Sequence, residues 1–582
     1  MAKELYFQKG DPSKLGITQC NGGYNFAFIS EYDELELRIL RLKTKELYCS
    51  IKLDEGFKIG NVFAIFVKGI TLKEFIYAYY YNNTALLDCT ACNTLTTREF
   101  MENSDEDSYY VYKDVSFDWE ADKKPQIANK DMLIYKLHTR GFTKDNNSKV
   151  KAKGTYAGII EKIPYMKELG ITSIELYPVH NFEDIIFAKS RFAPCMAPGK
   201  NYWGYSSGHY YMPKPEYAAT KGVNFVNEFK ELVKQLHKNG MELILEMHFP
   251  QDVIPHIVID AIRYWVMEYH IDGIHINCDN VILDLVKSDP ILSDIKVLST
   301  YFERERNIYS LKNDRLIDYN DEFLINARRF LKGDEDVLRE FAKAFSNKSP
   351  RVNYVACQNS FTLMDTVSYD KKHNEQNGEN NRDGQSYNYS WNCGEEGPSR
   401  KKKIQALRRK QIKNALSMVF LSKGIPLLMA GDEFGNSQQG NNNPYCIDGK
   451  LTWLDWKDLD KNKEIYSFAK AIIDFRKKYL QTMSDNMEIS FHSQNAWNQN
   501  FENADRDIGI MYSDLQTGQY VYIAYNMHWE ERKLALPNLK GRTWQIKLDT
   551  SAKADVLRDE RRVVLEGRTL VVLVGESDEK VI

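Results

Sequence analysis

The 582-residue sequence has little of several features that mark special protein classes. Its nine cysteines are odd in number and scattered, which does not suit a disulfide framework. Lys and Arg (78) nearly balance Asp and Glu (81), so the formal net charge of −3 gives no reason to expect a nucleic acid as partner. No apolar run approaches the length of a membrane span, and the first residues contain no apolar core of signal-peptide length. We therefore expect a cytoplasmic protein with reduced thiols that binds neither membranes nor nucleic acids.

Motifs for cofactors and metals are also scarce. No glycine-rich loop of the phosphate-binding type occurs in the chain. Cys89 and Cys92 form a single CxxC pair, and one pair cannot complete a four-ligand zinc site. We expect no cofactor and no metal.

Three regions differ in their pattern of apolar residues. Residues 1–125 contain β-rich runs such as YNFAFIS and EFIYAYYYN, separated by Gly and Asn turns. In residues 126–478, apolar β-type runs alternate with amphipathic helical stretches. Residues 479–582 are again rich in β-type runs, such as QYVYIAYNMHWE. The length suits such a division into several domains.

The alternation in the middle region predicts a parallel sheet with helical crossovers, hence an α/β fold. An eight-stranded (β/α)8 TIM barrel fits its length, and a doubly wound sheet is the alternative. Seven strands can be assigned, and the sixth, within 303–350, cannot be located. In a barrel, functional side chains lie at the carboxyl ends of the strands. The residues at these positions are His138, Arg140, His180, His248, His275, Asn277, Thr300, Gln358, Asn359, Asp432 and Glu433.

Three long segments carry a family resemblance: NYWGYSSGHYYMP (201–213), KHNEQNGENNRDGQSYNYSWNCGEEGP (372–398) and AGDEFGNSQQGNNNPYCIDGKLTWLDW (430–456). They resemble the isoamylase and glycogen-debranching, pullulanase-like branch of glycoside hydrolase family 13. The resemblance implies an N-terminal β-sandwich similar to family 48 carbohydrate-binding modules, a (β/α)8 barrel and a C-terminal antiparallel β domain. The implied boundaries are 1–125, 126–478 and 479–582. The implied activity is hydrolysis of α-1,6 branch points in glycogen or starch-derived glucans.

The sequence departs from this family at its catalytic positions. The nucleophile position on the fourth strand holds Asn277, the acid/base position on the fifth holds Thr300, and the third carboxylate position holds Asn359. A retaining glycosidase needs one carboxylate to attack the anomeric carbon and a second carboxyl to protonate the leaving oxygen. An amide and a hydroxyl supply neither function near neutral pH. We therefore predict a catalytically degenerate member, a pseudoenzyme.

Supporting positions have changed as well. His275 stands where the family has Arg, Gln358 stands where it has His, and the strand-three motif ends at Gln251. Tyr205 and Trp203 match a family segment beside the site, and contact between an aromatic ring and a sugar needs only an exposed ring face. We expect these five residues to contact substrate. Packing of Tyr205 and Trp203 within their loop is the alternative.

Other carboxylates could take over the chemistry. Asp279 follows Asn277 by two residues, Glu246 replaces a family Asp, and Glu303 follows Thr300 by three. Rescue would need two carboxyls about 5–5.5 Å apart for retention or about 6.5–9.5 Å apart for inversion. The simpler interpretation is that these three carboxylates are solvated charges on loops.

Three hypotheses therefore stand. The first is non-catalytic binding of α-glucan, such as glycogen or a branched maltooligosaccharide, as a binding protein or regulatory subunit in glycogen or starch metabolism. The second is a scaffolding partner in a homo- or hetero-oligomer with an active debranching enzyme, without glucan binding. The third is an active α-1,6-glucan hydrolase that uses relocated carboxylates.

Overall fold

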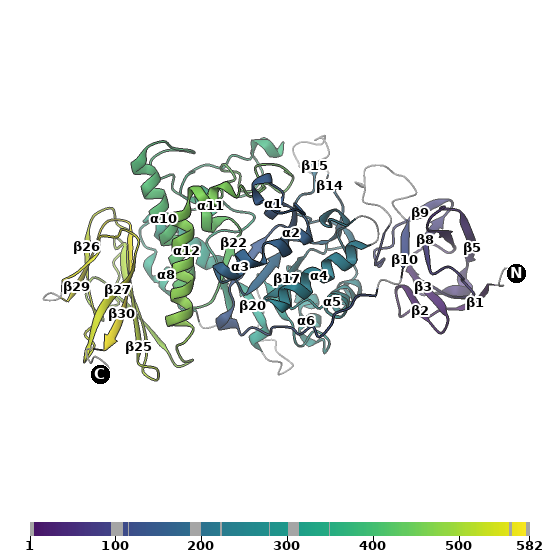
Figure 1. The fold of residues 1–582 in the computed structure, drawn as a ribbon, viewed down its shortest axis with the longest axis horizontal. Helices are drawn as coiled ribbons and strands as arrows, with labels where there is room; N and C mark the ends of the chain where they lie inside the picture. Colours follow the sequence, from purple (N-terminus) through teal and green to yellow (C-terminus); the bar gives the residue numbers. More distant parts are fainter. Residues whose placement is uncertain are drawn as a thin grey trace.

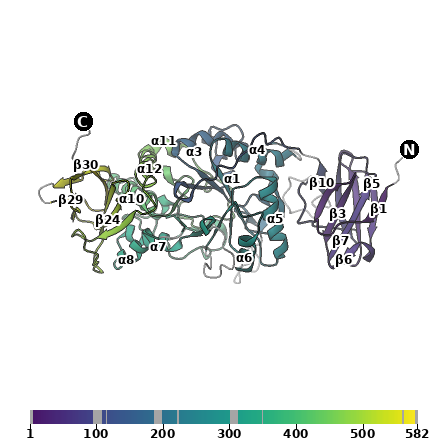
Figure 2. The same ribbon diagram turned by 90° about the horizontal axis from the view of Figure 1, so that it is seen from below.

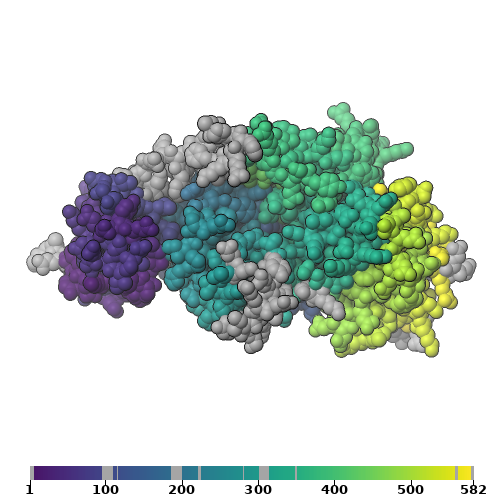
Figure 3. All heavy atoms as spheres, turned by 180° about the vertical axis from the view of Figure 1, so that it is seen from behind, coloured from purple at the N-terminus to yellow at the C-terminus, as the bar shows by residue number. Residues whose placement is uncertain are grey.

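The computed structural model describes residues 5–94, 109–113, 116–186, 199–220, 224–278, 280–300, 313–347, 350–557 and 561–577. Figure 1 shows three bodies in a row along the long axis of the molecule. A barrel lies in the centre, and a β domain lies at each end. The view from below in Figure 2 and the space-filling view from behind in Figure 3 show the same order.

The N-terminal body consists of two antiparallel sheets. Their inner faces are aromatic, and Phe28 stacks on Tyr79 with ring centroids 4.2 Å apart. The first sheet contains β1 (Tyr6–Lys9), β7 (Val62–Lys68), β3 (Gly23–Ile29), β2 (Gly16–Cys20) and β6 (Lys58–Ile59). The second contains β10 (Tyr110–Lys113), β8 (Glu74–Tyr81), β4 (Leu35–Arg41), β5 (Leu47–Leu53) and β9 (Thr84–Leu86).

The central body is a closed barrel of parallel strands, which confirms the predicted barrel and shows that the doubly wound alternative is wrong. Pairing of the first strand with the last, Ile134 opposite Leu427, closes it. Its strands are β11 (Ile134–Leu137), β12 (Ser173–Leu176), β17 (Glu242–Met247), β18 (Gly273–Ile276), β19 (Lys296–Ser299), β20 (Leu316–Tyr319), β21 (Arg351–Asn353) and β22 (Ile425–Met429).

Helices surround the barrel, as the alternating pattern predicts (Figure 1). They bury their apolar residues against the strands, and polar residues face outward. The helices are α1 (Thr139–Thr143), α2 (Tyr156–Glu161), α3 (Ile163–Leu169), α4 (Phe225–Lys238), α5 (Pro255–Glu268), α6 (Asn280–Ser288), α7 (Asp321–Lys332), α8 (Leu338–Phe345), α9 (Leu363–Thr366), α10 (Lys402–Leu421), α11 (Lys457–Lys461) and α12 (Lys463–Phe475). Among the described helices, none is long and apolar enough to cross a membrane.

The sixth strand, β20, is the one that the sequence pattern did not reveal. It has only four residues, and Asp318 interrupts its apolar run. Asp318 is buried and lies 3.8 Å from Arg351 of the neighbouring strand β21. Because the partner of Asp318 lies on another strand, the residues of β20 alone do not show the apolar pattern of a buried strand.

The C-terminal body packs against α10, and in Figure 1 it lies beside α10 and α12. Asn414 of α10 accepts a hydrogen bond from Thr550 at 2.8 Å and donates one to the carbonyl of Arg568 at 3.0 Å. Its larger sheet contains β23 (Glu488–His492), β24 (Asp507–Asp514), β25 (Gln519–Asn526), β30 (Thr569–Ser577) and β27 (Arg542–Asp549). Its smaller sheet contains β26 (Arg532–Ala535), β29 (Arg562–Leu565) and β28 (Asp555–Leu557).

Candidate functional site

Asn277, Thr300 and Asn359, the three residues that the sequence motifs predict at catalytic positions, meet at the carboxyl end of the barrel. Asn277 directly follows β18, Thr300 directly follows β19, and Asn359 lies in the loop after β21. The strands are parallel, so these ends open on the same mouth. All three residues line one cavity of about 280 Å³, which we call the mouth cavity.

The side chains of Asn277 and Thr300 are bonded to each other. The Thr300 hydroxyl donates to Oδ1 of Asn277 at 2.6 Å, and the Thr300 backbone N–H donates to the same oxygen at 3.2 Å. Oδ1 of Asn359 accepts a weak hydrogen bond from Sγ of Cys357 at 3.0 Å. Every group in these contacts is neutral, so this part of the cavity carries no charge.

The remaining wall of the mouth cavity is also largely neutral. Among its described residues Asp321 is the sole carboxylate, and it accepts a hydrogen bond from the hydroxyl of Tyr354. The other lining residues with polar groups are His275, Tyr319, Tyr387, Tyr389, Cys357, Gln358, Ser360 and Gln385. Amides and phenols can both donate and accept hydrogen bonds, so this wall suits a neutral, hydroxyl-rich ligand.

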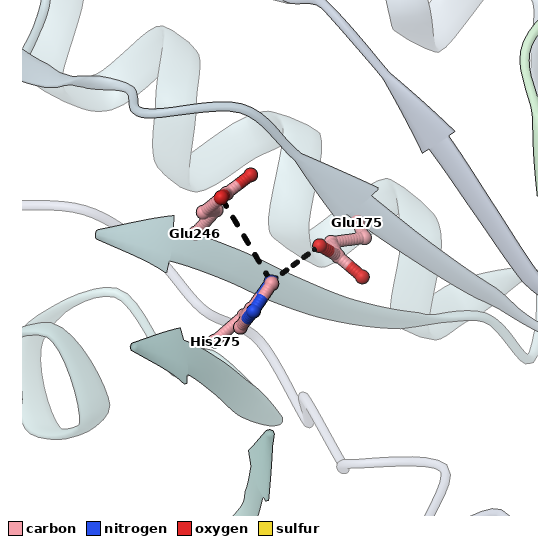
Figure 4. Close-up of side chains that lie close together, drawn as sticks. All are labelled: Glu175, Glu246 and His275. Carbon is pink, nitrogen blue, oxygen red and sulfur yellow. Dashed lines mark hydrogen bonds and ion pairs between the residues drawn. The ribbon is translucent and has the colours of Figure 1, made fainter. Parts of the chain in front are cut away.

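Charged side chains gather one layer deeper, inside the barrel. Lys136 projects from β11, Glu175 from β12, Glu246 from β17 and His275 from β18, and each is at most 3% exposed. Nζ of Lys136 lies 2.8 Å from a carboxylate oxygen of each glutamate. Nδ1 of His275 lies 2.9 Å from Glu175 and 4.0 Å from Glu246, as Figure 4 shows. We call these four residues the interior network.

Mutual charge compensation stabilises the ionised forms of Glu175 and Lys136 in the interior network. Burial by itself would raise the pKa of Glu175, but Lys136 and His275 outweigh it and hold that pKa well below the usual range. Burial by itself would lower the pKa of Lys136, but the two carboxylates outweigh it and raise the pKa. Tyr319 adds a hydrogen bond to Glu175 and stacks on His275 with ring centroids 4.2 Å apart.

Tyr205 connects the interior network to the mouth cavity. Its hydroxyl donates to Glu246 at 2.8 Å and accepts from Nε2 of Gln358 at 3.0 Å. Both oxygens of Glu246 are thus engaged, one by Tyr205 and one by Lys136, and Glu246 does not line the mouth cavity. This carboxylate is poorly placed to replace a catalytic one. The other two candidates, Asp279 and Glu303, lie outside the described residues.

The interior network also has the geometry of a metal site without its chemistry. Glu175, Glu246 and His275 offer one ligand atom each within 4.8 Å of one another. The ammonium group of Lys136, however, already lies 2.8 Å from both carboxylates. A metal cation would have to displace this ammonium from a buried position, so these residues do not fit a metal.

The residues expected to contact a sugar divide into three groups. His275 and Gln358 line the mouth cavity, and Tyr205 is half-buried beside it. Trp203 is only 7% exposed and packs edge-on against Tyr205, so its rings are part of the loop core. Gln251 is exposed in a turn and is not among the residues that line the cavity.

Sequence reasoning missed two groups of residues at this site. Tyr387 and Tyr389 belong to one of the segments that carry the family resemblance, but nothing in that segment marks them as cavity residues. Lys136 and Glu175 did leave a signal, because each is a charged residue within an otherwise apolar barrel strand. A buried charge needs a partner, so such a residue predicts a second one on a neighbouring strand.

Comparisons with known proteins agree with this architecture. Residues 136–251 match the family described as alpha amylase, catalytic domain. The chain is 26% identical to the protein named Isoamylase SU1, chloroplastic, of Zea mays, over 94% of this chain and 85% of that protein. It is 32% identical to the Glycogen operon protein GlgX homolog of Mycobacterium tuberculosis, over 62% of this chain and 60% of that protein.

Solved structures share the fold along nearly the whole chain. The catalytic module of the glycogen-degrading pneumococcal virulence factor SpuA superposes with a TM-score of 0.73 at 17% identity, covering 96% of this chain and 97% of that one. A pullulanase from Paenibacillus barengoltzii, solved in complex with maltohexaose and alpha-cyclodextrin, gives 0.71 at 18% identity, covering 97% and 95%.

Proposed function

Since this chain belongs to the isoamylase and glycogen-debranching branch of glycoside hydrolase family 13, we propose that its barrel mouth binds α-glucan without hydrolysing it. One observation carries the proposal. Asn277, Thr300 and Asn359, which we align with the family's catalytic positions, line one cavity whose neighbouring side chains are almost all neutral.

The chemistry of glycosidic cleavage supports the loss of activity. Hydrolysis with retention or inversion needs two carboxyl groups, one to protonate the leaving oxygen and one to act as nucleophile or base. The described wall of the mouth cavity offers Asp321 alone, and Tyr354 already donates a hydrogen bond to it. Replacement of one member of a catalytic constellation commonly lowers the rate by orders of magnitude.

The character of the cavity supports binding. Hydroxyl-rich sugars are recognised by neutral hydrogen-bonding groups and by aromatic rings that cover their apolar faces. Gln358, Gln385 and Asn359 provide the first, and Tyr387 and Tyr389 provide the second. A pullulanase of the same fold was solved in complex with maltohexaose, so the fold is compatible with a linear α-glucan.

Two assays on the purified protein test the proposal together. Reducing-end release from glycogen and pullulan should stay at background, and migration through a gel that contains glycogen should be retarded. Tyr387→Ala should weaken the retardation by up to about tenfold, because it removes a ring that can cover a sugar face. Tyr6→Ala is the matched control, since Tyr6 is 60% exposed on β1 and Tyr387 is 58% exposed.

The other hypotheses predict different results. Release of reducing ends that is abolished by Asp279→Asn or Glu303→Gln would overturn the proposal in favour of a relocated active site. Unretarded migration together with co-purification of an active debranching enzyme would favour the scaffolding role. If Tyr6→Ala weakens retardation as much as Tyr387→Ala, glucan binds to the N-terminal β domain rather than to the mouth cavity.

A further inference from the structure

A second cavity, of about 250 Å³, lies at the opposite end of the barrel. Its walls come from residues that precede β11 and β22, from the first residue of β21, and from the segment that follows α12. Tyr512 of β24 in the C-terminal domain completes it. We call it the basal cavity. It lies at the amino ends of the strands, whereas barrel catalysis takes place at their carboxyl ends.

Positive charge dominates the wall of the basal cavity. Lys130, Arg351, Lys423 and Arg476 line it, and Asp485 is the acidic residue among the lining residues. Arg351 has carboxylates nearby, but only at 3.8 Å and beyond. Within the described residues, no carboxylate lies at ion-pair distance from the side chain of Lys423 or Arg476. Lys423 and Arg476 therefore place positive charge on this wall without a direct carboxylate partner among the described residues.

Arg476 is the most informative of these cations, because it is only 7% exposed. Its guanidinium donates to the carbonyls of Phe420, Ser422 and Gly424 at 2.8, 2.9 and 2.6 Å. These bonds fix the turn that connects α10 to β22, and they hold the group rigidly. Burial lowers the pKa of Arg476 to about 10, so the group stays protonated at neutral pH. A buried cation whose direct hydrogen-bond partners are neutral carbonyls attracts an anion.

Apolar side chains also form a substantial part of the wall, beside polar residues such as Gln481 and Ser484. Ile425, Leu480, Met483, Met487 and Tyr512 contribute side chains to the basal cavity. Bare inorganic phosphate would leave this surface unused, and a purely apolar ligand would leave the cations unneutralised. The volume of about 250 Å³ corresponds to several water molecules, since each occupies about 30 Å³ of liquid.

We propose that the basal cavity binds a small organic phosphate monoester. The phosphate dianion lies against Arg476 and Lys423, and the organic part covers Met483 and Leu480. A preorganised guanidinium is well suited to phosphate because it presents several donors in a fixed plane. The proposal is independent of whether the mouth cavity binds glucan, since the two cavities lie at opposite ends of the barrel.

Calorimetric titration of the full chain tests the proposal with three probes: phenyl phosphate, glucose 6-phosphate and inorganic phosphate. We expect saturable binding, tightest for phenyl phosphate because of the apolar wall. Lys423→Gln should weaken phenyl phosphate binding about tenfold, as expected for the loss of one charge-assisted hydrogen bond. Lys478→Gln is the matched control, because Lys478 is exposed two residues after Arg476 and does not line the cavity.

A second variant tests the contribution of the apolar wall to binding separately from that of the cations. Met483→Glu introduces a negative charge beside the proposed organic part and should abolish phenyl phosphate binding, while a preserved thermal transition shows that the chain still folds. Failure of all three probes to bind at millimolar concentration would overturn the proposal. Equal affinity for inorganic phosphate and phenyl phosphate would overturn the monoester assignment, and equal weakening by Lys478→Gln would show that binding occurs elsewhere.

Discussion

The mouth cavity and the interior network lie next to each other in the barrel. The wall of the mouth cavity is largely neutral, whereas the interior network contains buried ion pairs. Asn277 and Thr300 are exposed and neutral at the mouth. Two residues before Asn277, within β18, His275 is buried against Glu175, and both belong to the interior network. Residues two apart on a strand share one face, so a single register places both layers.

The contrast shows that carboxylates inside the barrel need not be catalytic when they are paired with a cation. In the interior network both carboxylates lie 2.8 Å from the ammonium group of Lys136, which leaves neither of them free to attack a substrate. At the mouth, Asn277 and Asn359 carry amides and Thr300 carries a hydroxyl. None of these groups can attack a substrate as a carboxylate does. Carboxylates near the site are therefore not evidence of activity by themselves.

The largest expected effect comes from removing the central cation of the interior network. Lys136→Met leaves two buried carboxylates without their counter-charge, and breaking a buried pair in this way costs about 3–5 kcal/mol. Scanning calorimetry should show a lower transition temperature for the barrel. Adding Glu175→Gln and Glu246→Gln to Lys136→Met should recover most of the loss, because the carboxylates then no longer need a cation. A loss below about 1 kcal/mol for Lys136→Met would mean that water reaches this layer.

The second effect depends on pH and comes from Asp432, a buried carboxyl with no ion-pair partner among the described residues. Burial raises the pKa of Asp432, just beyond β22, to about 8. A carboxyl whose pKa is higher in the folded than in the unfolded chain loses stability as pH rises from about 4 to about 8. Asp432→Asn keeps an acceptor for the N–H of Leu363 and should stabilise the barrel at pH 8.5 by about 2 kcal/mol more than at pH 5.

Asp448 provides a control of opposite sign. It lies 2.8 Å from Arg140 and 2.7 Å from Lys200. Burial alone would raise the pKa of Asp448, but these two cations lower it to about 2. Its contribution to stability is present above pH 4 and is lost only as pH falls toward 2. Asp448→Asn should therefore destabilise at pH 8.5, and stabilisation by both variants would show that net charge, rather than local burial, governs the result.

The two regions also differ in how far the sequence could predict them. The strand–helix alternation predicted the barrel, and the family motifs placed Asn277, Thr300 and Asn359 at strand ends. The partnership of Lys136 with Glu175 and Glu246 depends on the register of three strands that are far apart in the chain, and a single sequence does not encode this register visibly. The sequence did not reveal β20 for the same reason. Asp318 is typical of a loop, and its partner Arg351 on β21 is known only from the structure.

A smaller loss of stability is expected at Tyr205, which connects the interior network to the mouth cavity. Tyr205→Phe removes a hydroxyl that donates to Glu246 and accepts from Gln358, and it keeps the ring. Loss of a hydrogen bond to a charged group costs about 1.5–3 kcal/mol at most, and the half-buried position places the cost near the lower limit. Retardation in glycogen gels should also weaken, because Gln358 loses the partner that orients it in the mouth cavity. Lower stability with unchanged retardation would show that the link is structural alone.

The smallest effect is expected at the mouth itself. Thr300→Val removes the hydroxyl that donates to Asn277 at 2.6 Å, but solvent can replace this bond at an exposed position. The expected loss of stability is about 0.5 kcal/mol, and Thr300→Ser, which keeps the hydroxyl, should lose less. Urea unfolding of the three proteins side by side can resolve the order. If Thr300→Val destabilised the barrel as much as Lys136→Met, the Thr300–Asn277 contact would contribute as much to stability as the interior network, and the predicted contrast between the two regions would be wrong.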